Sequence, residues 1–100
     1  MKADIKKDGK KTFVTLEGRL DTTNAEQFQK DIAPLMEDPE PDIEIDCTGM
    51  EYTSSQGLRL FLMLQKSVTM KRGTMVMKNM RSQFKQVFDI TGFSNIIKIV

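Results

Sequence analysis

Hydrophobic and polar residues alternate in two short stretches at the start of the chain, on either side of a turn. Residues 2–6 form a weak alternating stretch, and residues 11–16 are rich in β-favouring threonine, phenylalanine and valine. Asp8-Gly9, which lies between them, is a dipeptide typical of hairpin turns. Gly18 is expected to break the second strand. The pattern therefore predicts an antiparallel hairpin.

A helix is predicted next. Thr23 and Glu26 form the capping-box pattern of a helix start. Apolar residues that recur at helical spacing behind it are Phe28, Ile32 and Leu35. Pro34 is expected to kink or shorten this helix, and Pro39 and Pro41 are expected to end it.

A strand, a loop and a long helix follow. The alternating apolar residues of the strand are Ile43, Ile45 and Cys47. This period of two indicates a strand with one covered face. Residues 48–53 are interpreted as a loop, and residues 56–70 as a helix. Its packing side consists of Leu58, Phe61, Leu62 and Leu64. Lys71 and Arg72 give it a basic last turn, and Gly73 is the predicted glycine stop.

The remaining chain predicts a short buried strand over residues 74–78, a third helix and a last apolar strand over residues 95–100. The third helix turns Phe84, Val87 and Phe88 inward and ends near Thr91-Gly92. Met63, Met75 and Met77 are expected to fill the core. The order ββαβαβαβ predicts a single α/β domain over residues 1–100. Its mixed, mostly parallel β-sheet would pack with about three helices.

Composition narrows the function classes. The 15 Lys and Arg against 14 Asp and Glu give a net charge of +1, which provides no concentrated basic face for nucleic acid. The chain has no histidine, and Cys47 is its only cysteine, which argues against a catalytic histidine, a structural metal site and an internal disulfide. No stretch reaches the roughly 18 apolar residues of a membrane span, and the first residues lack a signal-peptide pattern. We therefore expect a cytoplasmic protein that has no metal or cofactor and is not an enzyme.

The segment from Asp46 to Leu58 combines several features of a functional site. A strand ends in an acid, a loop follows, and Ser54 and Ser55 open an apolar helix. Sites in open parallel sheets gather beyond the carboxyl ends of the strands. A helix start also offers unpaired N–H groups and the positive end of the helix dipole, which tolerate a phosphate. Serine is equally a common helix cap, and the local pattern by itself favours that interpretation for Ser54 or Ser55.

Three further stretches occur in a fixed order along the chain. They are Glu17-Gly18-Arg19-Leu20-Asp21, then residues 45–58 with Thr53-Ser54-Ser55-Gln56-Gly57-Leu58, and then Phe88-Asp89-Ile90-Thr91-Gly92-Phe93. Together they resemble three segments of the STAS domain family of bacterial anti-sigma factor antagonists. Those segments precede the first helix, form the phospho-acceptor helix start and close the third helix. The resemblance covers nearly all 100 residues.

The resemblance implies a partner-switching cycle. The unphosphorylated antagonist binds an anti-sigma factor serine kinase and frees a sigma factor; the kinase then phosphorylates it, and a PP2C-type phosphatase reverses the modification. Register fixed on Gly57-Leu58 places the acceptor on Ser55. Ser54, where many relatives carry Asp, is the second choice. The implied partner-binding residues are Asp21, Thr22, Asp46, Thr53, Ser54, Ser55, Gln56, Gly57 and Arg59.

Two alternatives remain open at this stage. A non-switching STAS adaptor, such as a subunit of an ABC-type lipid transporter, would use the serine region only for docking. The apolar segment Ile96–Val100 either leaves an edge for weak homodimer formation or is a short version of the last strand of the family.

Overall fold

The computed structural model describes residues 1–100 and confirms the predicted order of elements. The elements are β1 (Lys2–Asp8), β2 (Lys11–Leu20), α1 (Ala25–Glu37), β3 (Asp42–Thr53), α2 (Ser55–Met70), β4 (Thr74–Lys78), α3 (Ser82–Thr91), the 3₁₀ turn η1 (Phe93–Asn95) and β5 (Lys98–Ile99). Five strands form one sheet in the order β1-β2-β3-β4-β5. The β1–β2 pair is antiparallel and the other pairs are parallel, so the mixed sheet is confirmed.

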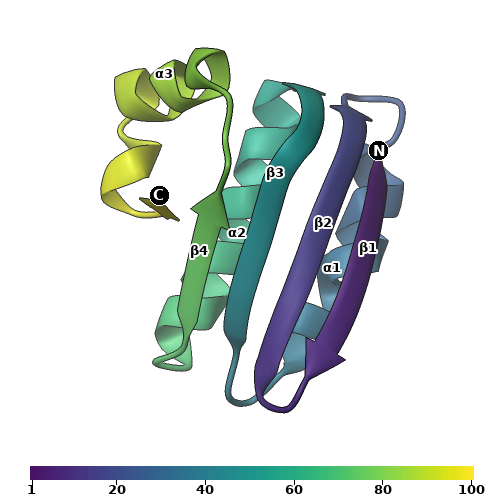
Figure 1. The fold of residues 1–100 in the computed structure, drawn as a ribbon, viewed down its shortest axis with the longest axis vertical. Helices are drawn as coiled ribbons and strands as arrows, with labels where there is room; N and C mark the ends of the chain where they lie inside the picture. Colours follow the sequence, from purple (N-terminus) through teal and green to yellow (C-terminus); the bar gives the residue numbers. More distant parts are fainter.

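Helices α1 and α2 pack on one face of the sheet and leave the other face open (Figure 1). Alternation along the strands explains this arrangement, because successive side chains of a strand point to opposite faces. In β2, Val14 and Leu16 are buried whereas Phe13 and Thr15 are exposed. The largest fully buried side chains on the covered side include Phe28, Phe61, Leu16, Ile43, Ile45 and Leu64. The core therefore lies between the sheet and the two helices.

The second and third strands extend further than the sequence predicted. β2 continues through Gly18, which takes a φ of 96° beside a register shift, so the expected break is wrong. Residues 48–53 are the second half of β3 rather than a loop, and they pair with β2 up to Leu20 and Thr53. Met50 is fully buried there. Pairing with a neighbouring strand and burial of Met50 override the loop-like sequence.

The start of α1 differs from the predicted capping box. Asn24, not Thr23, is the N-cap, and its side chain makes no cap hydrogen bond. The Thr23 hydroxyl donates instead to the carboxylate of Asp21. Pro34 does not shorten the helix, which continues to Glu37. Proline lacks one backbone N–H donor, and Pro34 is exposed, so only one hydrogen bond of the helix is lost.

The end of α2 and the last strand differ from the prediction. Arg72, with a φ of 57°, takes the left-handed position that was assigned to Gly73. Gly73 is required for another reason, since a Cβ there would lie 2.2 Å from the carbonyl oxygen of Pro41. The last strand is only Lys98–Ile99, because η1 precedes it. Helix α3 ends at Thr91-Gly92, as predicted, and Gly92 takes the left-handed conformation.

Two hydrophobic residues that were expected to be buried, Met63 and Val87, are partly exposed to solvent. Met63 on α2 is 42% exposed and Val87 on α3 is 39% exposed, whereas Met75, Met77, Phe84 and Phe88 are buried. Met63 and Val87 lie on helix faces that no other element covers fully. None of the helices is both long and apolar enough to cross a membrane.

Candidate functional site

The start of α2 lies at the carboxyl ends of β2 and β3 (Figure 1). The backbone N–H of Ser54 donates to the carbonyl of Leu20 at 2.8 Å, which ties the helix start to the end of β2. Gly57 is buried in the first turn of the helix. A Cβ at this position would lie 2.5 Å from Thr53 Oγ1 and 2.7 Å from Leu20 Cδ2. Only glycine therefore permits this close packing of helix against strand.

The two adjacent serines occupy different environments. Ser54 is the N-cap of α2, and its Oγ accepts a hydrogen bond from the N–H of Gly57 at 3.2 Å. Ser55 is the first residue of the helix and is exposed, and the cap does not use its hydroxyl. The structure thus assigns the cap, which the local sequence left open, to Ser54. Negative charge on Ser55 would meet unpaired helix N–H groups and the positive end of the dipole.

The β2–α1 connection forms the neighbouring part of the site, because Asp21 directly follows Leu20. The Asp21 carboxylate accepts hydrogen bonds from Thr23 Oγ1 at 2.5 Å and from the Thr23 N–H at 3.0 Å. The Asn24 side chain accepts from the Asp21 N–H and donates to the carbonyl of Arg19. The Thr23 hydroxyl, then its N–H and to a smaller extent Arg19, lower the pKa of Asp21. The loop therefore holds an ionised carboxylate beside the helix start.

A cation–π pair that the sequence did not reveal lies on the last rungs of β2 and β3. The Arg19 guanidinium carbon is 4.4 Å from the centroid of the Tyr52 ring, and the two residues are register partners. Tyr52 is 38% exposed. Arg19 and Tyr52 meet because β3 pairs with β2 as far as these residues. A loop over residues 48–53, as the sequence predicted, would not include this strand pairing.

Asp46 does not lie beside the serines. It precedes Thr53 by seven residues on the same strand, which at about 3.3 Å per residue places it roughly 23 Å from the end of the strand that leads into α2. Its carboxylate accepts from Thr48 Oγ1 at 2.6 Å, the Thr48 N–H at 3.0 Å and Asn79 Nδ2 at 3.2 Å. The Thr48 hydroxyl is the largest cause that lowers the pKa of Asp46. The resemblance implies Asp46 as a partner-binding residue close to the acceptor, but in this fold Asp46 lies away from Ser55.

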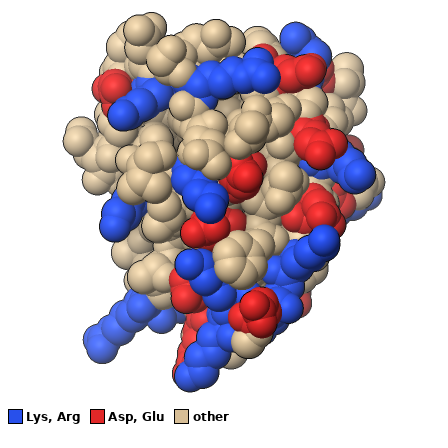
Figure 2. Space-filling view, in the orientation of Figure 1, with Lys and Arg blue, Asp and Glu red and all other residues tan.

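The open face of the sheet carries interleaved acidic and basic side chains (Figure 2). Glu44 accepts from Lys78 at 2.9 Å and lies 3.5 Å from Lys11. The bond to Lys78 lowers the pKa of Glu44 and raises that of Lys78. These partly exposed pairs balance one another, so the face carries no concentrated charge.

The remaining predicted residues divide between the surface and the interior. Thr22, Gln56 and Arg59 are exposed near Ser55, Thr53 is half-buried, and Gly57 is buried. No group of three or more Cys, Asp or Glu side chains gathers where it could hold a metal ion. Burial, and then the charge of Asp46, raise the pKa of the Cys47 thiol to about 12, so this thiol stays protonated and unreactive.

Comparisons with known proteins agree with this architecture. The family model described as Mlab, STAS domain matches residues 3–99. The anti-sigma-B factor antagonist of Bacillus subtilis is 29% identical over 96 residues, which cover 96% of this chain and 87% of the relative. BtrV of Bordetella bronchiseptica is 28% identical over 99 residues, which cover 99% and 85%. The fold is also similar to that of the Bacillus cell fate determinant SpoIIAA, which has been solved in unphosphorylated and phosphorylated forms. The phosphorylated form matches with a TM-score of 0.77 at 17% identity, covering 99% of this chain and 91% of SpoIIAA.

Proposed function

The chain belongs to the STAS domain family, and from that premise we propose that it acts as an anti-sigma factor antagonist. Its unphosphorylated form binds an anti-sigma factor serine kinase and thereby frees a sigma factor. The exposed hydroxyl of Ser55, beside a separate cap at Ser54, carries this proposal. The similarity to the anti-sigma-B factor antagonist of Bacillus subtilis, at 29% identity, supports it.

Phosphorylation of Ser55 is compatible with an unchanged fold. A phosphate adds about −1.5 to −2 charge at neutral pH. On Ser55 it projects from the first residue of α2, where the helix N-terminus favours negative charge and the Ser54–Gly57 cap bond is left intact. On Ser54 it would replace the hydroxyl that makes the cap, in a half-buried position. We therefore assign the acceptor to Ser55.

The same phosphate would disrupt binding to the kinase. The proposed contact surface consists of Asp21, Thr22, Thr53, Ser54, Ser55, Gln56 and Arg59, with Arg19 and Tyr52 at its border. A kinase surface matched to a neutral hydroxyl and to the ionised Asp21 would meet added negative charge and a desolvation penalty. A loss of about 3 kcal/mol corresponds to more than a hundredfold weaker binding. Asp46 is left outside this surface because it lies half a strand away.

Reversal of the switch requires a phosphatase that reaches the phosphoserine. Ser55 is exposed at the end of the sheet, so a PP2C-type phosphatase can reach it without local unfolding. The binding form is thus the dephosphorylated one, and kinase and phosphatase together set its concentration.

Phosphate mapping tests the assignment. The protein is incubated with ATP and the anti-sigma kinase encoded beside it, and the modified residue is located by mass spectrometry. We expect phosphate on Ser55 in the parent and none in Ser55→Ala, which still binds the kinase. Ser82→Ala is the matched control, because Ser82 is also an exposed first residue of a helix. Phosphate on neither Ser54 nor Ser55, with no kinase binding, would favour the transporter adaptor.

A further inference from the structure

The two edges of the sheet differ greatly in length. β5 contributes only Lys98–Ile99 at one edge, whereas β1 at the other edge is the seven-residue strand Lys2–Asp8, paired on one side alone. A free edge of this length presents N–H and C=O groups that a further strand can pair with. Only Lys98–Ile99 of the segment Ile96–Val100 forms a strand, so β1 is the longer edge available for self-association.

Charged side chains alternate along the open face of β1. Lys2, Asp4, Lys6 and Asp8 are all exposed and occupy every second position, which a strand places on one face. When the strand is set antiparallel to a second copy of itself about Ile5, Lys2 faces Asp8 and Asp4 faces Lys6. Two-fold symmetry repeats both pairs, so four opposite-charge contacts form across one strand pair.

Other arrangements bring like charges together. A shift of two residues in one direction sets Asp4 against Asp4 of the second copy, and a shift in the other direction sets Lys6 against Lys6. Parallel pairing in register places every charge opposite its own kind. Opposite charges stabilise directly opposed positions and like charges destabilise them. Among closed two-fold pairings of β1 with a second copy, the antiparallel one about Ile5 therefore makes the largest number of opposite-charge contacts.

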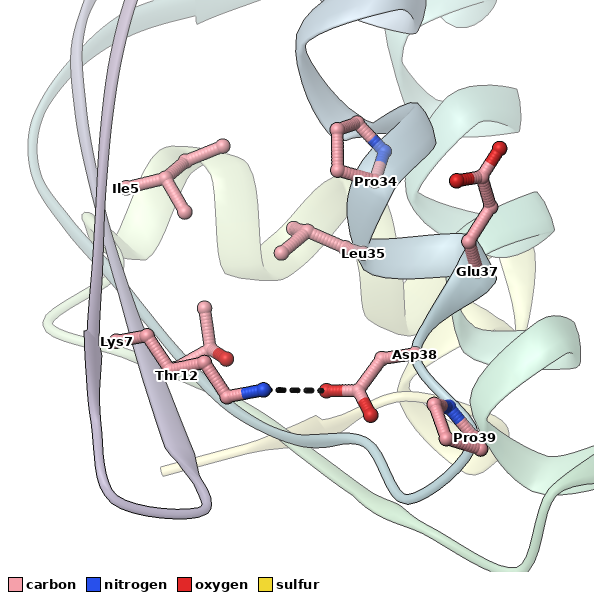
Figure 3. A pocket seen from close by; sticks show the side chains of 8 residues that line it. All are labelled: Ile5, Lys7, Thr12, Pro34, Leu35, Glu37, Asp38 and Pro39. Carbon is pink, nitrogen blue, oxygen red and sulfur yellow. Dashed lines mark ion pairs between the residues drawn. The ribbon is translucent and has the colours of Figure 1, made fainter.

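The helix-facing side of β1 offers an apolar contact at the centre of this arrangement. Ile5 lines a cavity of about 360 Å³ between β1, β2 and the last turns of α1, across from Leu35 (Figure 3). Lys7 closes part of it, with Nζ 3.8 Å from the carboxylate of Asp38. Directly opposed residues of antiparallel strands have Cα atoms about 4.5–5.5 Å apart. A second Ile5 at the two-fold axis would therefore extend the apolar wall of the cavity.

We propose that β1 is a self-association surface whose partner is the β1 strand of a second copy, paired antiparallel about Ile5 into one continuous sheet. A single strand pair buries less than the roughly 1,200–2,000 Å² of stable interfaces, so the dimer is weak. Its exposed ion pairs make it sensitive to salt. The start of α2 lies beyond the carboxyl ends of β2 and β3, so the dimer leaves Ser55 free and the inference is independent of the proposed switch.

Sedimentation equilibrium of the full chain between about 10 µM and about 1 mM tests the dimer. The parent is expected to show a monomer–dimer equilibrium that weakens several-fold when the salt is raised. Asp4→Lys and Lys6→Glu are each expected to be monomeric, since each creates two like-charge pairs. Their equimolar mixture is expected to dimerise, because every pair is then of opposite sign. Asp89→Lys and Lys66→Glu make the same charge changes at exposed helix positions and should associate like the parent.

Cross-linking tests the register. Ile5→Cys is expected to form a disulfide-linked dimer under mild oxidation, because Ile5 faces its own copy. Ala3→Cys should not, since Ala3 faces Lys7 of the second copy. The buried thiol of Cys47 stays out of the reaction. A parent that is monomeric at about 1 mM, charge variants that dimerise like the parent, a mixture that stays monomeric, or equally fast cross-linking by both cysteine variants would each overturn the proposal.

Discussion

Helices α2 and α3 begin with the same two residues, Ser55-Gln56 and Ser82-Gln83, and both serines are exposed. The third residue differs. In α3 it is Phe84, which is buried and anchors the helix. In α2 it is Gly57, because Leu20 and Thr53 occupy the space that a side chain would need.

The surroundings of the two serines differ as well. The N-cap of α2 is Ser54, which makes a side-chain cap bond, whereas the N-cap of α3 is Arg81, which makes none. The end of β2 joins the start of α2 through the Ser54 N–H, which donates to Leu20, and Asp21 directly follows Leu20 in the chain. An exposed serine at a helix start therefore does not by itself mark a functional site. Ser55 differs from Ser82 because the end of β2 and the loop that begins with Asp21 lie beside the start of α2.

The largest expected difference between the two helix starts is in kinase binding. Ser55→Asp should weaken binding to the anti-sigma kinase by about a hundredfold or more, because it places negative charge within the proposed contact surface. Ser82→Asp makes the same change at the start of α3 and should bind like the parent. Isothermal titration calorimetry of both variants measures the difference. Equal affinities would remove the functional distinction between the two helices.

Packing at the third helix residue gives the next largest effect. Gly57→Ala should lower the free energy of unfolding by about 1–3 kcal/mol, because its Cβ would overlap Thr53 and Leu20. Urea unfolding followed by circular dichroism provides the measurement. Gln83→Ala, at an exposed position of α3, should change stability little. An unchanged midpoint for Gly57→Ala would mean that β2 does not hold the start of α2 closely.

The helix caps should differ by a smaller amount. Ser54→Ala removes the bond to the Gly57 N–H and should lower the free energy of unfolding by about 1 kcal/mol. Arg81→Ala removes no cap bond and should have a smaller effect. The same urea experiment compares them, and a larger loss for Arg81→Ala would reverse the comparison.

The smallest effect concerns the acidic loop that only α2 has beside it. Thr23→Val removes the hydroxyl that donates to Asp21, so the pKa of Asp21 should rise toward its ordinary value. Because the folded pKa lies below the unfolded one, the ionised Asp21 stabilises the fold above the unfolded pKa of about 3.9, and this contribution disappears as the pH falls through the folded pKa. Carboxyl NMR titration of parent and variant checks the direction. Coinciding titration curves would show that the Thr23 hydroxyl does not lower the pKa of Asp21.

Local patterns in the sequence determined the helices, the strands and most buried faces. Phe28 and Ile32 follow the helical period, and Ile43 and Ile45 follow the strand period, because side-chain direction repeats with the local backbone geometry. The candidate serines were also visible, since a hydroxyl pair before an apolar run is a local pattern. Family resemblance then singled out Ser55 from that pair.

Only the tertiary structure decided how these elements meet. The pairing of β3 with β2 turned residues 48–53 into strand, set Arg19 against Tyr52 and moved Asp46 away from the serines. It also separated the capping Ser54 from the exposed Ser55. Each outcome depends on contacts between residues far apart in the chain. The hydrophobic periodicity of one segment predicts its own secondary structure but does not show which strand will pair with it.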